Sequence, residues 1–259
     1  MGTIIPVISP KGGVGKTTVT ANLAAALGAD HASIIAIDTD PQNALCLHLG
    51  LDPERSPGWT EAVIAGTGLD PRALLRQSPY HIAIIPFGYT TESEQRLVEE
   101  RLAERPGLLS GLLNALKNLA DFVLIDTPPG RTVFQQEALA ADCSAVVVVL
   151  LADAASYAAL PLIWRDLEHR PELPAWFLLN QYDSARKLDH DVARTMRSQL
   201  GFRLLPIPIH RDEFVREALA QQKPALLYSP GALISRDFRD LARWLRQSLG
   251  KPSPSKIFG

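Results

Sequence analysis

A glycine-rich segment near the amino terminus, Ser9-Pro-Lys-Gly-Gly-Val-Gly-Lys-Thr-Thr18, limits the possible folds of this chain more than any other stretch. It follows an apolar run at 4–8 that predicts a strand, and it precedes a helical pattern at 17–27. Glycines allow positive φ and a close approach to an anion, and the start of a helix favours negative charge. Strand, glycine loop and helix in this order therefore predict a phosphate-binding loop.

The end of this loop suits a nucleotide bound together with magnesium. Lys16 would reach the β- and γ-phosphates as a point charge, and the Thr17 hydroxyl would ligate Mg²⁺. Thr18 would add a second hydroxyl to the phosphate cradle. One position departs from the ordinary pattern, because Pro10 stands where a glycine is usual and is followed by an extra lysine, Lys11.

This variant is the deviant Walker A loop, and the stretch resembles the ParA/MinD class of ATPases. In that class the early lysine reaches across a dimer interface to the partner's nucleotide. The resemblance implies ATP and Mg²⁺ as cofactors, an ATP-sandwich homodimer, and catalytic roles for the two lysines. The residues expected to bind the nucleotide here are Lys11, Gly12, Gly13, Val14, Gly15, Lys16, Thr17 and Thr18.

Composition sets a few outer limits. The 259 residues, 46% of them hydrophobic, suffice for one α/β domain, expected over 1–250, with a flexible tail at 251–259. A net charge of −2 demands neither a nucleic acid nor a membrane as partner. The two cysteines match no metal or redox spacing, and the longest apolar run, 145–152, is too short for a membrane helix. A cytoplasmic location is the default expectation.

Apolar runs alternate with helical patterns along the chain. This alternation predicts a doubly wound, mostly parallel sheet of about seven or eight strands flanked by helices, the P-loop NTPase fold, with the ligand at the carboxyl ends of the strands. The expected strands are 4–8, 33–37, 82–86, 122–125, 145–151, 176–180 and 203–207. The expected helices are 17–27, 92–103, 108–119, 133–141, 157–167, 188–200, 213–221 and 234–249, with an irregular excursion at 52–79.

Two aspartates, Asp38 and Asp40, close the second strand, where the first loop would hold the phosphates. ParA-like ATPases carry Asp-x-Asp-Pro-Gln at this point. The resemblance implies that Asp38 lies near Mg²⁺ and its waters and that Asp40 orients the attacking water. A helix N-cap before Pro41 is the alternative for Asp40, and one residue can do both.

The apolar strand at 122–125 ends in Asp126, as a Walker B strand does, and this carboxylate would reach the Mg²⁺ shell. The turn that follows, 127–130, could respond to the γ-phosphate as a switch. Arg131 comes next and would contact phosphate or a partner, or remain a solvated loop residue.

Adenine would be recognised late in the chain. Asn180 ends a strand, and its amide can pair with both a donor and an acceptor on the base, although a turn or cap role is the alternative. The resemblance adds the loop after the next strand as a second contact, which brings in Pro208, His210 and Arg211.

Shorter pieces resemble one family within the class, the cellulose biosynthesis ATPases called BcsQ. These pieces are 204–213, 216–224, 58–66 and 86–88, and partition ATPases usually have proline where this chain has His210. The resemblance implies a role beside the bacterial cellulose synthase at the inner membrane. It also implies a small BcsR-like protein and a BcsE-like cyclic-di-GMP sensor as partners.

Three other functions remain open at this stage. A DNA-partition ATPase would need a basic face, and a MinD-like membrane binder would need an exposed C-terminal amphipathic helix. A scaffold that binds ATP but barely hydrolyses it is the third. The arginines at 236, 239, 243 and 246 alternate with an apolar stripe, which favours a packed amphipathic helix with a solvated basic face.

Overall fold

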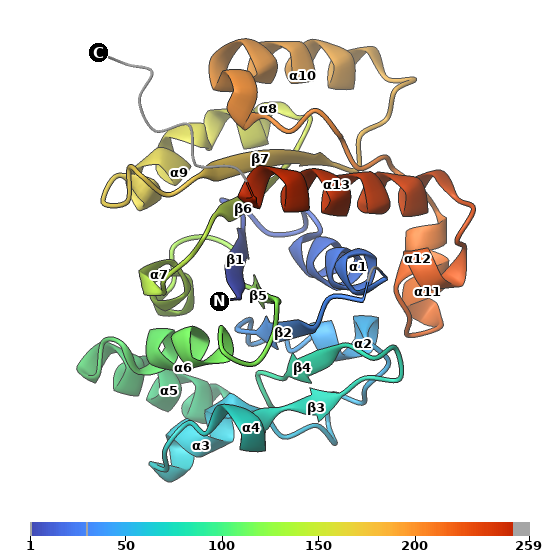
Figure 1. Ribbon diagram of the computed structural model, residues 1–259. Coiled ribbons are helices and arrows are strands. Elements are labelled where there is room, and N and C mark those ends of the chain that lie inside the picture. Colours follow the sequence, from blue (N-terminus) through green and yellow to red (C-terminus); the bar gives the residue numbers. More distant parts are fainter. Residues whose placement is uncertain (1, 30, 251–259) are drawn as a thin grey trace.

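The computed structural model describes residues 2–29 and 31–250 and has a seven-stranded sheet between two layers of helices (Figure 1). The strand order is β3-β4-β2-β5-β1-β6-β7, and only the β3–β4 pair is antiparallel. The strands are β1 (Thr3–Ile8), β2 (Ile34–Asp38), β3 (Arg76–Gln77), β4 (Ala83–Ile85), β5 (Phe122–Asp126), β6 (Val146–Leu151) and β7 (Ala175–Asn180). The predicted doubly wound, mostly parallel fold is confirmed.

Alternate residues of each strand serve two separate cores, because successive side chains point to opposite faces. In β1, Ile5 and Val7 belong to one core, and Ile4 and Ile8 belong to the other. This explains why the strands are apolar throughout rather than alternating. The helices on the Ile5 face are α1 (Lys16–Gly28), α2 (Leu45–His48), α11 (Phe214–Ala220), α12 (Ala225–Tyr228) and α13 (Leu233–Leu249).

The opposite face carries the larger group of helices, drawn in cyan to orange in Figure 1. An edge-to-face cluster of Trp59, Phe87 and Phe134 packs at its centre, with ring centroids 5.3–6.1 Å apart. The helices of this layer are α3 (Trp59–Ala65), α4 (Pro71–Leu74), α5 (Glu92–Glu104), α6 (Leu108–Leu116), α7 (Val133–Ala140), α9 (Leu160–Leu167) and α10 (Lys187–Leu200). Helix α8 (Ala154–Ala158) leads into α9.

Two sequence predictions were wrong in detail. The helix expected at 157–167 is divided into α8 and α9, because Pro161 lies in the first turn of α9 and has no N–H to continue the earlier helix. The strand expected at 203–207 is absent. Gly201–Arg203 forms a 3₁₀ turn, and among the described residues one isolated bridge, between Leu204 and Phe177, joins the segment to β7.

The missing strand has a local cause. Leu205 donates its backbone N–H to Phe177 and Ile209 donates to Leu179, so four steps along this segment match two steps along β7. Pro206 and Pro208 flank Ile207 and cannot donate, and the residues between 205 and 209 therefore leave the ladder. The predicted tail at 251–259 lies outside the described residues. No helix within 2–29 and 31–250 is long and apolar enough to cross a membrane.

His48, in α2, gives the fold a defined acid sensitivity. Burial lowers the pKa of this imidazole to about 4, from an unfolded value near 6.5. Below pH 6.5 His48 becomes protonated in the unfolded chain but stays neutral in the folded chain. The free energy of unfolding should therefore fall by roughly 1.4 kcal/mol per pH unit between pH 6.5 and pH 4. In urea titrations, His48→Gln should flatten this slope and His169→Gln, at an exposed site, should not. Equal slopes in both variants would contradict the assignment.

Candidate nucleotide site

The loop between β1 and α1 has the conformation that its glycines predicted. Gly13 and Gly15 both adopt positive φ, of 74° and 88°. Asn180, at the end of β7, donates its side-chain Nδ2 to the Val14 carbonyl over 2.7 Å. The loop is thus clamped from a neighbouring strand, and Asn180 holds the phosphate loop as well as bordering the same cleft.

Gly15 is required here for two independent reasons. Its φ is strained for any residue with a side chain, and a Cβ at this position would lie 2.5 Å from Nδ2 of Asn180. Gly15→Ala should therefore destabilise the nucleotide-free protein by about 1–3 kcal/mol. Gly12→Ala is the matched control, because its Cβ would meet only Pro129 at 3.8 Å. Thermal unfolding of both variants tests this, and equal losses would argue against it.

Lys16 turns back into its own loop. It is buried, and its Nζ donates to the Ser9 hydroxyl over 3.0 Å. Burial lowers the pKa of Lys16, while the charges of Asp126 and Asp40 act in the opposite direction. A phosphate bound in this loop would give the Lys16 ammonium a direct anionic partner in addition to the neutral Ser9 hydroxyl.

Asp126, the last residue of β5, is fully buried beside this lysine. Burial raises the pKa of its carboxyl to about 7, opposed by the neighbouring Thr17 hydroxyl and Lys16 ammonium. Thr20 donates to Oδ1 over 3.3 Å, but Oδ2 has no hydrogen-bond partner among the described residues. A buried carboxylate oxygen without a partner, next to a threonine hydroxyl, is a site that suits a hard cation.

Asp38 ends β2, as expected, and lies directly across from Asp126. Its two carboxylate oxygens accept the backbone N–H groups of Asp40 (2.9 Å) and Leu45 (3.0 Å). Burial, followed by the charge of Asp126, raises the pKa of Asp38 well above its usual value. Asp38 therefore shapes the turn after β2, and its role in the Mg²⁺ shell stays a prediction.

Asp40 borders the cleft, as a water-orienting residue would have to do. Its Oδ1 accepts the N–H of Gln42 over 3.0 Å, which closes a local turn around Pro41. The alternative reading as a helix N-cap was wrong, since α2 begins only at Leu45 and is preceded by Ala44 without a side-chain cap.

The residues of this site fit a magnesium ion. The charge of Asp40 contributes to the raised pKa of both Asp38 and Asp126, and the Lys16 ammonium acts in the opposite direction on Asp126. A divalent cation would relieve this excess of carboxylates. Within 2–29 and 31–250 no group of three histidine, cysteine or acidic side chains forms a cage, but Mg²⁺ uses few protein ligands beside phosphate oxygens and water.

Lys11 does not face its own loop. Its Nζ forms an ion pair with Oδ2 of Asp153 at 2.6 Å, and both side chains are about one-third exposed. Burial would raise the pKa of Asp153, but hydrogen bonds from Lys11 and Ser156 outweigh it and hold the pKa below its usual value. The two lysines of the loop therefore point to different partners.

The cleft continues from the phosphate loop to the segment between the 3₁₀ turn and α11. Its volume is about 710 Å³, and Gly12, Asp40, Asn180, His210 and Arg211 are among the residues that line it. Pro208, also expected there, instead lines a separate cavity of about 300 Å³ next to α10. Arg131, the residue of open role, pairs with Asp166 on α9, Nε to Oδ1 at 3.4 Å.

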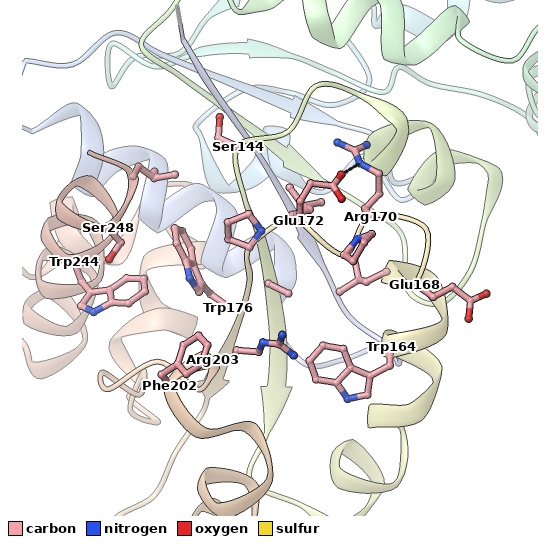
Figure 2. A pocket seen from close by; sticks show the side chains of 16 residues that line it. Ser144, Trp164, Glu168, Arg170, Glu172, Trp176, Phe202, Arg203, Trp244 and Ser248 are labelled. Atoms are coloured by element: carbon pink, nitrogen blue, oxygen red, sulfur yellow. Dashed lines mark ion pairs between the residues drawn. The ribbon is translucent and has the colours of Figure 1, made fainter. Parts of the chain in front are cut away.

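A larger cavity, of about 820 Å³, lies at the opposite end of the sheet. Figure 2 shows Trp164, Trp176 and Trp244 around it, with the Arg203 guanidinium over the Trp164 ring at 4.9 Å from the centroid. Its lining residues include Ser144 and Ala175, which lie at the amino ends of β6 and β7. The phosphate loop is at the carboxyl ends, so this cavity is not the nucleotide site.

Comparison with known proteins places the chain in a family. The family model described as "Cellulose biosynthesis protein BcsQ" matches residues 3–245. The chain belongs to the BcsQ family. BcsQ of Salmonella typhimurium is 29% identical over 239 residues, which cover 90% of each chain.

The wider class is evident from two more proteins. The chromosome partitioning protein ParA of Caulobacter vibrioides is 28% identical over 251 residues, covering 93% of this chain and 92% of that one. The structure of the septum site-determining protein MinD from Pyrococcus horikoshii, complexed with Mg-ADP, superposes with a TM-score of 0.81. It is 26% identical and covers 96% of this chain and 98% of its own. The chain is thus a ParA/MinD-class protein of the BcsQ family, and its relatives are ATPases.

Two partners within the site were missed by the sequence analysis. Asp153 directly follows β6, which is the neighbour of β1 in the sheet. Its position after an apolar strand could therefore have predicted that it lies at the carboxyl edge of the sheet, near the loop that follows β1. Asp237 lies in the middle of α13 and contacts His210, and nothing in the local sequence marks it.

Proposed function

We propose that this protein is a dimeric switch driven by Mg²⁺-dependent ATP hydrolysis, acting at the bacterial cellulose synthase secretion complex. The observation that carries the proposal is the opposite placement of the two loop lysines. Lys16 lies inside its own phosphate loop, whereas Lys11 is held outside it on Asp153. A lysine that does not serve its own site is available to the nucleotide of a second subunit.

The chemistry follows from charge and position. Two chains each bind ATP and close face to face, with Lys16, Thr17 and Thr18 at their own phosphates. The partner subunit's Lys11 leaves Asp153 and adds a second positive charge at the γ-phosphate. Asp40 orients the attacking water, and the charge that develops on the phosphate oxygens is stabilised by the two ammonium groups.

Thr17 and Asp126 are the residues that would hold Mg²⁺. When bound, the ion neutralises charge on the β- and γ-phosphate oxygens. The unpartnered Oδ2 of Asp126 supports this placement. Catalysis in this arrangement consists of positioning and electrostatics, so a single subunit should hydrolyse ATP very slowly.

The cellulose role rests on the family. A BcsR-like small protein, a BcsE-like cyclic-di-GMP sensor and the membrane-bound synthase are the partners we propose. The ATP-bound dimer and the ADP-bound monomer would offer them different surfaces. The protein would act on the cytoplasmic side of the inner membrane, recruited by its partners.

Light scattering together with phosphate release tests the switch. Solution mass is measured with Mg-ATP, with ADP and without nucleotide, for the wild type, for Asp40→Ala and for Asp52→Ala. Asp40→Ala should form a lasting ATP dimer and lose phosphate release, because the attacking water is no longer oriented. Asp52→Ala changes an exposed carboxylate in the segment after α2, outside the cleft, and should behave as wild type.

The outcomes separate a switch from a scaffold and test Asp40 independently. A dimer that needs ATP and falls apart as hydrolysis proceeds supports the switch. A mass indifferent to nucleotide, without phosphate release, contradicts it and indicates a scaffold. Unchanged turnover in Asp40→Ala would remove Asp40 from the mechanism while leaving the switch intact.

DNA partitioning is the second candidate, because the ParA relative is almost as similar as BcsQ. Some of the basic residues of α10 and α13 that could contact DNA are already engaged in contacts within the protein. Arg197 donates to the Leu204 and Leu205 carbonyls, and Arg243 pairs with Asp240 at 2.7 Å. DNA binding with a steep salt dependence would favour partitioning nonetheless.

Membrane binding through α13 has less support. Its apolar residues Ile234, Phe238, Leu241 and Leu245 are buried, and α13 lies against α1 (Figure 1). The apolar stripe of this helix is packed as expected, but Arg246, on the predicted solvated face, donates to the Leu27 carbonyl and lies over the Phe122 ring. Co-sedimentation with lipid vesicles that required ATP would revive the membrane hypothesis.

A further inference from the structure

One buried serine joins the phosphate loop to the turn that follows β5. Ser9, directly after β1, is only 2% exposed. Its hydroxyl accepts a hydrogen bond from Nζ of Lys16 over 3.0 Å and donates one to the backbone carbonyl of Lys11 over 2.7 Å. Its own carbonyl accepts the backbone N–H of Gly130 over 3.1 Å. Three separate parts of the site therefore meet at this residue.

The turn at 127–130 is attached to the end of β1 by two hydrogen bonds. Thr127 donates its hydroxyl to the Val7 carbonyl over 2.8 Å, and two residues further along β1 the Ser9 carbonyl accepts the N–H of Gly130. Pro129 of the same turn borders the cleft. A displacement of this turn would therefore act directly on Ser9.

Pro10, the residue that departs from the ordinary phosphate loop, restricts the backbone of Ser9. A proline ring confines the residue before it to extended conformations, whereas a glycine at position 10 would not. The carbonyl that Ser9 presents to Gly130 has less freedom as a result. The unusual sequence and the contacts of Ser9 thus act in the same direction.

The contact with Ser9 determines where the charge of Lys16 is placed. A lysine side chain is a flexible four-carbon stem that ends in three N–H donors. Among residues 2–29 and 31–250, the hydrogen-bond acceptor of this ammonium group is the Ser9 hydroxyl. One donor is used in this way, and the other two suit phosphate oxygens.

We infer that Ser9 is a positioning residue that holds the Lys16 ammonium in place and links it to the turn at 127–130. The inference rests on the proposed nucleotide function and deepens it. Phosphates that hold Lys16 also steady the Ser9 hydroxyl, because hydrogen bonds in a chain strengthen one another. The Ser9 backbone then holds Gly130 more firmly, so the turn responds to the phosphates through this serine.

Kinetics and affinity test the positioning role. Ser9→Ala keeps the charge of Lys16 but not its position, so kcat for ATP hydrolysis should fall by about ten-fold or more. The affinity for Mg-ATP, measured by calorimetry, should change by less than about three-fold, because the contact is lost from the free and the bound protein alike. Ser9→Thr keeps the hydroxyl and should have a kcat within about two-fold of the wild type.

Hydrogen exchange of the Gly130 amide tests the link to the turn without any turnover. Exchange is followed by NMR with and without a non-hydrolysable ATP analogue and Mg²⁺. In the wild type the analogue should slow exchange at Gly130 by at least about three-fold, because the acceptor carbonyl of Ser9 is held more firmly. This slowing should be absent in Ser9→Ala and present in Ser9→Thr.

Ser235→Ala is the matched control for loss of a buried serine hydroxyl. Ser235 is fully buried in α13 and donates to the Ser229 carbonyl over 2.8 Å, and it does not line the cleft. This variant should have a lower Tm but the wild-type kcat and the wild-type response at Gly130.

The results that would overturn the inference differ from those that would refute the proposed function. A Ser9→Ala variant with the kcat and the Gly130 response of Ser235→Ala would overturn the inference. So would a folded Ser9→Thr variant as slow as Ser9→Ala, or a wild type that binds the analogue without any change at Gly130. A wild type that does not bind the analogue at all would instead refute the proposed function.

Discussion

Lys16→Ala should lower the affinity for Mg-ATP by at least about a hundred-fold. The ammonium group is buried within the loop, and the phosphates would complete its environment, so its removal loses a charge-assisted contact in a dry site. Loss of this contact weakens binding in the monomer, before any dimer forms. Calorimetry at fixed Mg²⁺ on nucleotide-free protein measures the effect directly.

Lys117→Ala is the matched control for this substitution. Lys117 also has a defined partner, since it forms an ion pair with Asp142 at 2.5 Å, but it lies after α6 and outside the cleft. It should bind ATP as the wild type does. Circular dichroism should show both variants folded. An affinity of Lys16→Ala within two-fold of the control would mean that the loop does not hold the phosphates in the way proposed.

The phosphate loop could be predicted because its information is local. The sequence at 9–18 determines the positive φ values of Gly13 and Gly15 and the turn into α1. Asp126 could be placed for a related reason, since the carboxyl ends of parallel strands meet at one edge of a sheet. Register confirms this, because Asp38 and Asp126 are direct partners across β2 and β5.

What the sequence did not predict depends on long-range partners. Asp38 ends its strand as expected, but its carboxylate oxygens accept the backbone N–H groups of Asp40 and Leu45. The position of a residue at the end of a strand does not predict these hydrogen bonds. The Lys11–Asp153 pair joins residues separated by 142 positions. The strand predicted at 203–207 does not form because two prolines interrupt its pairing, although its apolar composition is that of a strand. The apolar composition of a segment predicts that it is buried, whereas its backbone hydrogen bonds determine whether it forms a strand.

Lys11→Ala should leave ATP binding to the monomer nearly unchanged and lower steady-state hydrolysis by roughly 10³-fold, the scale of a cation supplied in trans to a phosphoryl transfer. Lys11 does not contact its own loop's phosphate cradle, so affinity should survive. Its pair with Asp153 is about one-third exposed and contributes little to stability. The variant should therefore unfold at the wild-type temperature, which separates a catalytic loss from a folding defect.

Asp153→Asn provides the opposite perturbation at the same contact. Asparagine can still accept the N–H of Ser156 at the start of α8, as Asp153 does over 2.7 Å, but it no longer holds the Lys11 ammonium by charge. Freed from a pair worth up to about 1 kcal/mol, Lys11 should reach the partner's nucleotide more readily, so dimers should form at up to about five-fold lower protein concentration. Light scattering over a concentration series measures both variants together. If Lys11→Ala dimerised and hydrolysed ATP like the wild type, the lysine would serve only Asp153, and the ATP-sandwich mechanism would have to be abandoned.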